Sequence, residues 1–326
     1  MDHFSLPKLN LLIWTSSFLF LIFALIFPDQ MEIVEVPLFI FFVALIGIPH
    51  GATDHLIYKY NQILNGKSFS MTRFLIPYLV GMGCFSILWI LFPGLSLLVF
   101  LLISAYHFGQ SQFVFVNLPE KHLLKRIHYI LWGSWVLSCI ILLNLTMSEP
   151  ILANIIDIQS LWWKQLTENR GWLITGLTAS NGLLLIYFYM NKWIRFSNLI
   201  IESLSMLLLW LIANYTSLLI SFMVYFCLWH GLKSIHLEIR LLQKVEKNYS
   251  ISRFVKDAFP FSMISLLGIA GLIYATYYWN PSFSVYMMFF ILVSILTLPH
   301  FAFINRFYDL FSGHSKPINP SSSPVN

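Results

Sequence analysis

Long apolar runs joined by short polar loops constrain this chain more than any other feature of its sequence. A helix that crosses a bilayer needs about 20 mostly apolar residues. We expect ten such helices, at residues 9–27, 36–57, 74–92, 95–116, 127–145, 171–190, 198–213, 215–233, 259–279 and 283–304. Lipid cannot hydrogen-bond free backbone groups, and the short alternating segments of a membrane barrel do not recur. The sequence therefore predicts an all-α polytopic transmembrane helix bundle of about ten helices.

Composition excludes an ordinary water-soluble domain. The chain is 58% hydrophobic and 10% charged, whereas soluble domains are about 45–50% apolar and about 25% charged. The net charge of +5 does not indicate nucleic acid, because the basic residues occupy separate loops and form no basic face. Cys84, Cys139 and Cys227 fall inside apolar runs without a metal-binding spacing, and we interpret them as packing residues.

The loops alternate in charge, which predicts their orientation. Lys and Arg gather in the loops after the second, fourth, sixth and eighth predicted helices, whereas the loop 28–35 has three acidic residues and no basic one. This asymmetry predicts a multi-pass protein of the cell inner (cytoplasmic) membrane with both termini cytoplasmic. The first apolar run lacks a cleavage site and is expected to stay as a helix. Residues 1–311 are expected to form one membrane domain, and 312–326 a disordered cytoplasmic tail.

Four histidines interrupt the apolar runs. His50, His107, His230 and His300 lie in the second, fourth, eighth and tenth predicted helices, which all run inward. Each falls in the cytoplasmic half of its helix, so the four share a depth. Ionisable groups there are costly and tend to be functional, and neutral imidazole is the commonest metal ligand. We therefore predict a metal site whose ring nitrogens converge to within about 4 Å. The alternative for each histidine alone is a hydrogen bond to a neighbouring helix.

Further polar residues stand one turn from these histidines. Asp54 follows His50 by four residues, so it is expected to orient His50 or another ligand through its ring N–H. Its alternative is a helix-end carboxylate near Lys59. Others expected to hydrogen-bond around the site are Gln110, Ser111 and Ser234. The remaining histidines are expected to face elsewhere or to meet solvent or the interface: His3, His55, His122, His128, His236 and His314.

Four motifs carry a resemblance to a known family. They are Pro49-His50-Gly51-Ala52-x-Asp54, Tyr106-His107-Phe108-Gly109, Tyr225-Phe226-Cys227-Leu228-Trp229-His230 and Thr297-Leu298-Pro299-His300. In this order and spacing they resemble the Brp/Blh family of membrane β-carotene 15,15'-dioxygenases over nearly the whole chain. The resemblance implies a carotenoid-dioxygenase-like domain with a non-haem Fe(2+). It also implies cleavage of all-trans-β-carotene by O2 into two all-trans-retinal, and a link to a retinal-binding rhodopsin.

The resemblance places iron ligands at His50, His107 and His230, with a fourth at Ser234. Many members have His-x-x-x-His there, whereas this chain has His230-x-x-x-Ser234. Three protein ligands could suffice, His300 could complete the set, or iron binding could be weakened. The shared depth of the histidines favours His300. All-imidazole sites suit iron, zinc or copper.

We expect β-carotene to enter sideways from the lipid bilayer, because it is too apolar to cross water. Tyr106, Phe108, Trp229 and Phe301 are expected to line a tunnel beside the metal. The alternative is that these aromatics face lipid or pack helices, as most must in so Phe-rich a chain. No catalytic acid or base beyond the metal site is required.

Three other functions fit parts of the pattern. A di-iron hydroxylase needs His-x-x-x-His and His-x-x-His-His clusters, and neither spacing occurs. A transporter or haem-binding membrane protein would use the histidines as a proton relay or axial ligands. A non-catalytic carotenoid-binding helper on the same fold would tolerate Ser234. Bound iron and the visible spectrum distinguish these from an oxygenase.

Overall fold

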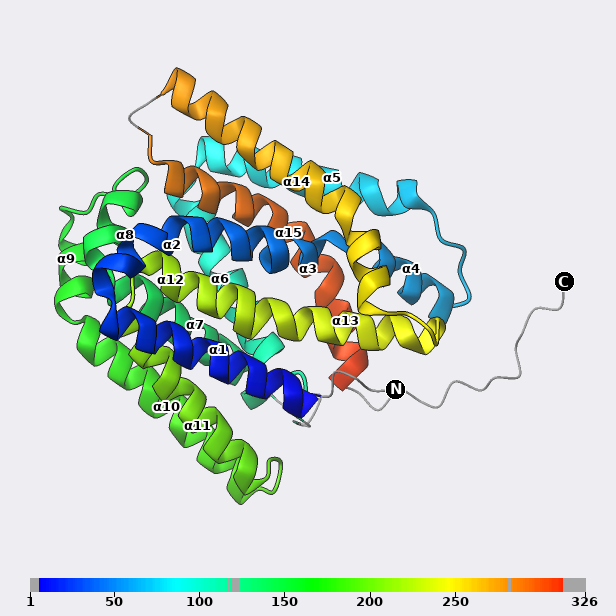
Figure 1. Cartoon of the computed structure of the whole chain (residues 1–326), viewed down its shortest axis with the longest axis horizontal. Helices are drawn as coiled ribbons and strands as arrows, with labels where there is room; N and C mark the ends of the chain where they lie inside the picture. Colours follow the sequence, from blue (N-terminus) through cyan, green and yellow to red (C-terminus); the bar gives the residue numbers. More distant parts are fainter. Residues whose placement is uncertain (1–5, 117, 119–122, 281–282, 313–326) are drawn as a thin grey trace, which may run out of the picture.

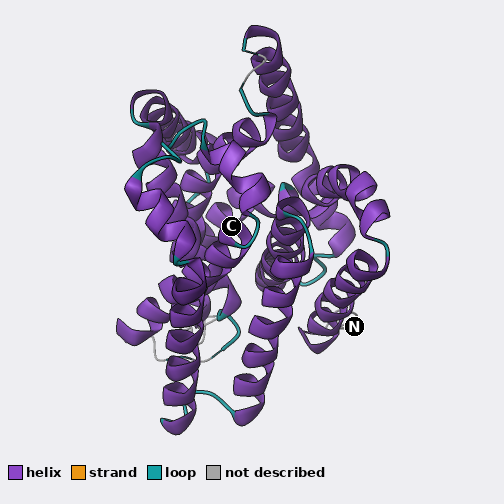
Figure 2. Ribbon diagram, turned by 90° about the vertical axis from the view of Figure 1, so that its left-hand side faces the viewer, coloured by secondary structure: helices purple, strands orange, loops and turns teal. Residues whose placement is uncertain are grey.

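The computed structural model describes residues 6–116, 118, 123–280 and 283–312. These residues form helices joined by loops, and no strand occurs among them (Figure 2). The structure is 86% helical. Almost all of the predicted tail, 312–326, lies outside the described residues.

The membrane-spanning helices agree with the predicted ones. Seven are single helices: α1 (Leu6–Ile26), α5 (Met71–Leu91), α6 (Pro93–Gln112), α10 (Arg170–Met190), α11 (Phe196–Tyr215), α14 (Ile251–Trp279) and α15 (Val285–Ser312). A further helix, α7 (Leu123–Leu142), qualifies as a span only together with the bent helix that follows it. Two spans are composite: α2 (Pro28–Phe42) with η1 (Val43–Gly47), α3 (Pro49–Ala52) and α4 (Asp54–Leu64); and α12 (Leu218–Met223) with η2 (Val224–Gly231) and α13 (Leu232–Val245). Within the described chain, nine helices can cross a membrane, or ten with α7 and the bent α8 (Leu145–Leu152) taken together. The predicted polytopic bundle is confirmed.

The span Leu218–Lys244 is the centre of the bundle. In its apolar window 89% of residues are buried inside the protein, against 17% in α5 and in α14. Large apolar side chains on those outer helices, such as Ile90 and Trp279, are exposed. A surface of this kind is stable only against lipid, because exposing so much apolar area to water is unfavourable. Figure 1 shows the span from α12 to α13 crossing the middle of the molecule, with α1 and α2 on either side of it.

Both composite spans contain a π-helical segment at a motif histidine. In η1 and η2 the chain makes wider turns, and His230 lies within η2 while His50 follows η1 by three residues. The first span breaks again at Thr53, between α3 and α4. Such insertions shift the face on which later side chains lie, and they are common at functional sites.

The helices α6 and α7 approach so closely that two glycines are required. A Cβ atom on Gly109 would collide with the backbone carbonyl of Tyr129, and one on Gly133 with that of Ala105. Small residues allow this backbone approach between membrane helices. Because Gly109 lies two residues after His107, the contact fixes the position of that histidine.

A short helical cap covers the end of the bundle away from the histidines. The helix α8 turns by 95° from α7. It is tied to α9 (Leu161–Glu168), since the Trp163 indole Nε1 donates to Glu149 Oε1 at 2.9 Å.

Candidate functional site

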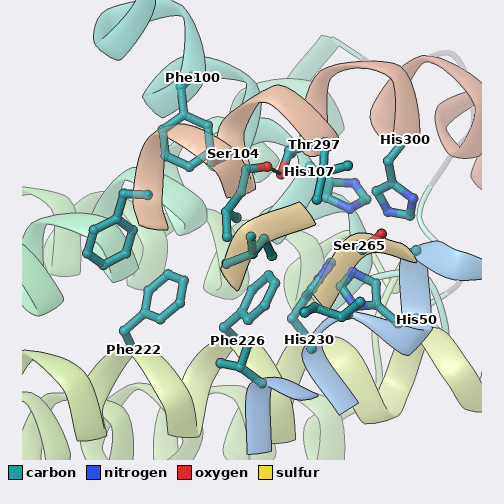
Figure 3. A pocket seen from close by; sticks show the side chains of 18 of the residues that line it. His50, Phe100, Ser104, His107, Phe222, Phe226, His230, Ser265, Thr297 and His300 are labelled. Carbon is teal, nitrogen blue, oxygen red and sulfur yellow. Dashed lines mark hydrogen bonds between the residues drawn. The ribbon is translucent and has the colours of Figure 1, made fainter. Parts of the chain in front are cut away.

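The four motif histidines meet in the interior, as their shared depth predicted. The His50 ring centroid lies 5.0 Å from that of His230 and 5.3 Å from that of His300. The His107 ring lies 4.8 Å from His230 and 5.3 Å from His300. All four side chains are buried. The rings thus form a closed set of four from four helices, which we call the histidine quartet (Figure 3).

Asp54 contacts His300 rather than its neighbour in sequence, His50. The His300 Nδ1 lies 2.8 Å from Asp54 Oδ1 and 3.0 Å from Oδ2. Tyr78 donates its hydroxyl to Asp54 Oδ2 at 3.1 Å. A carboxylate accepts, so His300 Nδ1 carries a proton, and in the neutral ring the lone pair is on Nε2. The break at Thr53 ends the helical register on which a shared face with His50 depended.

His230 is oriented in the same manner by Ser111. The Ser111 hydroxyl donates to the Phe108 carbonyl at 3.0 Å, and its oxygen lies 2.8 Å from His230 Nδ1. A hydroxyl has a single proton, which is given to Phe108, so Ser111 accepts from the His230 N–H. The Nε2 lone pair of His230 is therefore free, which is the state in which imidazole binds metals.

His107 has buried nitrogens that require a partner. It is 1% exposed, and neither Nδ1 nor Nε2 has a hydrogen-bond partner among the described residues. An unsatisfied buried polar group costs several kcal/mol in a lipid-like interior, roughly 2–7 kcal/mol by transfer measurements. Such groups are uncommon in proteins without a ligand, ion or water to satisfy them.

The imidazole nitrogens of the quartet are suitable ligands for a transition metal, although they are not arranged around a common point. Imidazole suits iron, zinc or copper, and the quartet brings His230 and His300, whose Nδ1 atoms are hydrogen-bonded, beside the unpartnered His107. Within the described chain, however, no group of three or more His, Cys, Asp or Glu is arranged to hold an ion. The expected convergence of the ring nitrogens is therefore not found. The rings meet edge to face at 74–89°, which is how uncharged aromatic rings pack.

Two residues that were expected to hydrogen-bond around the histidines contact other side chains near the quartet instead. Ser234 Oγ lies 3.2 Å from the Tyr308 hydroxyl. Gln110 donates from Nε2 to Asn305 Oδ1 at 2.8 Å. Both bonds join to the last turns of α15, and neither reaches a quartet nitrogen. Tyr308 connects these contacts to the site, since its ring lies 5.9 Å from that of His107.

A largely apolar cavity of about 470 Å³ adjoins the quartet, and all four histidines line it. Of the predicted tunnel residues, Phe108 lines the cavity, whereas Tyr106, Trp229 and Phe301 are absent from its described wall. That part of the prediction was wrong. Trp229 turns to α1 instead, and its Nε1 donates to Ser17 Oγ at 2.9 Å. Tyr106 packs against Tyr129, with ring centroids 5.8 Å apart.

Other aromatics form the wall in their place. Residues that sequence reasoning missed are Trp89, Phe100, Phe222, Phe226, Phe261 and Phe290. A spacing of four residues in Leu218, Phe222, Phe226 and His230 was the available signal. Residues at this spacing lie on one face of the helix only because the turns of η2 are wider than those of an α-helix.

The other histidines follow the predictions in part. His128 was expected at a helix end in contact with solvent or the interface, and this was wrong: it is fully buried, with its ring 4.4 Å from Phe113 and 5.3 Å from Phe188. His55 faces Phe261 at 4.7 Å and also lines the cavity. His3, His122 and His314 lie outside the described residues.

Fold and site together define a class: a multi-pass membrane protein in which a buried histidine quartet adjoins an apolar cavity. The chain belongs to the β-carotene 15,15'-dioxygenase family, whose model matches residues 41–308. A relative from uncultured marine bacterium 66A03, described as β-carotene 15,15'-dioxygenase, is 30% identical over 284 residues, which cover 85% of this chain and 94% of the relative. No solved structure matches the chain significantly.

Proposed function

We propose that this protein is a non-haem Fe(II) dioxygenase that cleaves the central 15,15' double bond of all-trans-β-carotene with O2, giving two all-trans-retinal. Membership of the family supports the reaction. The observation that carries the proposal is the histidine quartet beside a 470 Å³ apolar cavity, which is the size of a small-molecule site. β-Carotene is a hydrocarbon with no polar group to bind, so such a wall suits it.

His50, His107, His230 and His300 would hold the iron. Fe(II) would supply the electronic means by which O2 reacts with a closed-shell double bond. Asp54 and Ser111 keep the Nδ1 protons of His300 and His230 in place, so that the Nε2 lone pairs stay available. The apolar wall excludes water and holds the polyene.

The net reaction requires no acid or base from the protein. The C=C bond breaks, each carbon forms a C=O bond with one atom of O2, and O2 is the oxidant, so no proton or external reductant is consumed. The cavity wall is consistent with such a reaction, because the carboxylate of Asp54 accepts hydrogen bonds from His300 and Tyr78. A group so engaged positions a ring and is not available to move protons.

The setting we propose is the inner membrane, with both termini in the cytoplasm and the substrate arriving from the bilayer. The start of α1 and the end of α15 lie at the same end of the bundle, which supports termini on one face (Figure 1). Retinal released there would supply a retinal-binding rhodopsin.

A second candidate is a carotenoid-binding helper without catalysis. One observation favours it: Ser234 replaces a ligand expected from the family and bonds to Tyr308 at 3.2 Å. The cavity would still bind a carotenoid, and the quartet would then be a neutral polar cluster.

Coexpression in a bacterium that makes β-carotene tests the proposal. The wild type should deplete carotene and form retinal, while His107→Phe should form none. His128→Phe is the matched control, because it makes the same change at a histidine buried among aromatic rings outside the cavity wall. Persistence of carotene with a well-expressed wild type would refute the dioxygenase and leave the helper.

A further inference from the structure

On three of its four helices the quartet lies at one end of the run that lines the cavity. The fourth run, Val43 to His55, continues past His50, and with Phe74 on α5 and Phe261 on α14 it extends the cavity a short way beyond the quartet. Three helices line the cavity along their length, and on each the histidine is at the cytoplasmic end of the lining run: Leu97 to His107 on α6, Leu218 to His230 on α12 and η2, and Met287 to His300 on α15. Figure 3 shows this: the histidines gather on one side, and Phe100 and Phe222 lie on the other.

These runs measure the depth of the cavity. Each covers 11 to 14 residues along its helix, and the 10 to 13 rises of 1.5 Å between its end residues make about 15–20 Å. The deep end is closed by the cap helix α8 together with the outer ends of α12 and α15. We call this end the floor; its residues are Ser148, Ile151, Leu152, Leu218 and Met287.

The cavity opens at the quartet end, toward lipid. Leu79 on α5 and Ile264 on α14 line the cavity and are also 58% and 66% exposed; they are the only exposed residues in its described wall. Both stand near the middle of their helices. A Cβ on Gly81, half a turn from Leu79, would lie 3.6 Å from Pro299, so this mouth is level with His300.

A long linear substrate therefore has one route and one stopping point. It enters end first between α5 and α14, passes the quartet, and extends until its leading ring meets the floor. The remainder of the molecule stays at the mouth, among lipid-facing side chains. Only one half of a symmetric polyene then needs to fit in the protein.

We propose that the cavity is a ruler for one half of the carotenoid, in which the distance from floor to quartet selects the double bond that is cut. This inference rests on the proposed function. A shallower floor would bring a different C=C bond to the quartet. That bond would break with one oxygen atom of O2 forming a carbonyl on each carbon, so the two aldehydes would have unequal lengths.

Filling the floor tests the ruler. Leu218→Trp and Leu152→Trp act from two different helices, and both should yield an aldehyde shorter than retinal together with a complementary longer one. Thr146→Trp is the matched control: it lies on α8 as well but is exposed and outside the described wall, and should give retinal alone. Floor variants that give retinal alone, at whatever rate, would overturn the ruler.

A second measurement needs no variant. An apocarotenal that keeps one complete half and has a truncated other arm should be cut by the wild type at the same 15,15' bond, giving one retinal and one shorter dialdehyde. An uncut apocarotenal, beside efficiently cut β-carotene, would show that both halves are bound and would overturn the ruler. Failure of the wild type on β-carotene itself would refute the proposed function instead, so the two failures are distinguishable. If the floor variants fail to fold, this experiment decides.

Discussion

His300 Nδ1 lies 2.8 Å from Asp54 Oδ1, which joins the last transmembrane helix to the break between α3 and α4. Both side chains are buried. The bond keeps a proton on His300 Nδ1 and fixes the orientation of the ring beside His50 and His107. It connects residues 246 positions apart in the chain, so the quartet is complete only when α15 has packed beside α3 and α4.

Asp54→Asn should lower both iron affinity and the rate of retinal formation by about 10- to 100-fold, the usual effect of losing a partner that orients a metal ligand. The amide keeps the shape but removes the charge that holds the Nδ1 proton. Iron content after purification and the initial rate of retinal formation check this. Tyr78→Phe is the control, because it removes the second donor to Asp54 and leaves the His300 pair intact. Equal iron content in Asp54→Asn and the wild type would contradict the assigned role.

Gly109→Ala should destabilise the protein by about 1–3 kcal/mol or more, because the new methyl group meets the Tyr129 backbone and cannot be accommodated by a rotamer change. The thermal midpoint in detergent measures this. Gly83→Ala is the matched control: among the described residues nothing lies within 4 Å of its added Cβ. Equal thermal midpoints for Gly109→Ala and Gly83→Ala would show that α6 and α7 are not in the close contact described.

Ser234→His should not strengthen iron binding if His300 completes the ligand set. The introduced ring would meet the Tyr308 hydroxyl, which lies 3.2 Å from Ser234 Oγ, instead of the quartet. Competition with a chelator gives the iron dissociation constant. A tenfold lower iron dissociation constant, worth about 1.4 kcal/mol, would show instead that a histidine at position 234 can act as an iron ligand, which the wild-type serine does not supply.

The transmembrane spans and the common depth of the histidines could be predicted from the sequence, because each follows from a regular helix over many residues. Apolar length predicted the spans, and the predicted common direction of four helices placed His50, His107, His230 and His300 at one depth, where the structure brings them together. Both conclusions depend on counting residues along regular helices, which short irregularities hardly change.

Sequence reasoning failed where the answer depends on which face of a helix a side chain occupies. Trp229 precedes His230 directly, yet the wide turns of η2 direct it to Ser17 on α1. Asp54 was expected to orient His50 or another ligand, and the structure has the second case: the break at Thr53 ends the register with His50, and Asp54 contacts His300. His128 was misjudged because burial at a helix end depends on tertiary packing, here against Phe113 and Phe188. A regular 3.6-residue period cannot anticipate these local departures.

The most direct test of the central claim is the iron bound by purified protein in the wild type, His107→Phe and His128→Phe, measured together with retinal formation. We expect bound iron and cleavage in the wild type and in His128→Phe, and the loss of both in His107→Phe. Cleavage by a wild type free of iron, or full iron content in a folded His107→Phe variant, would contradict this claim.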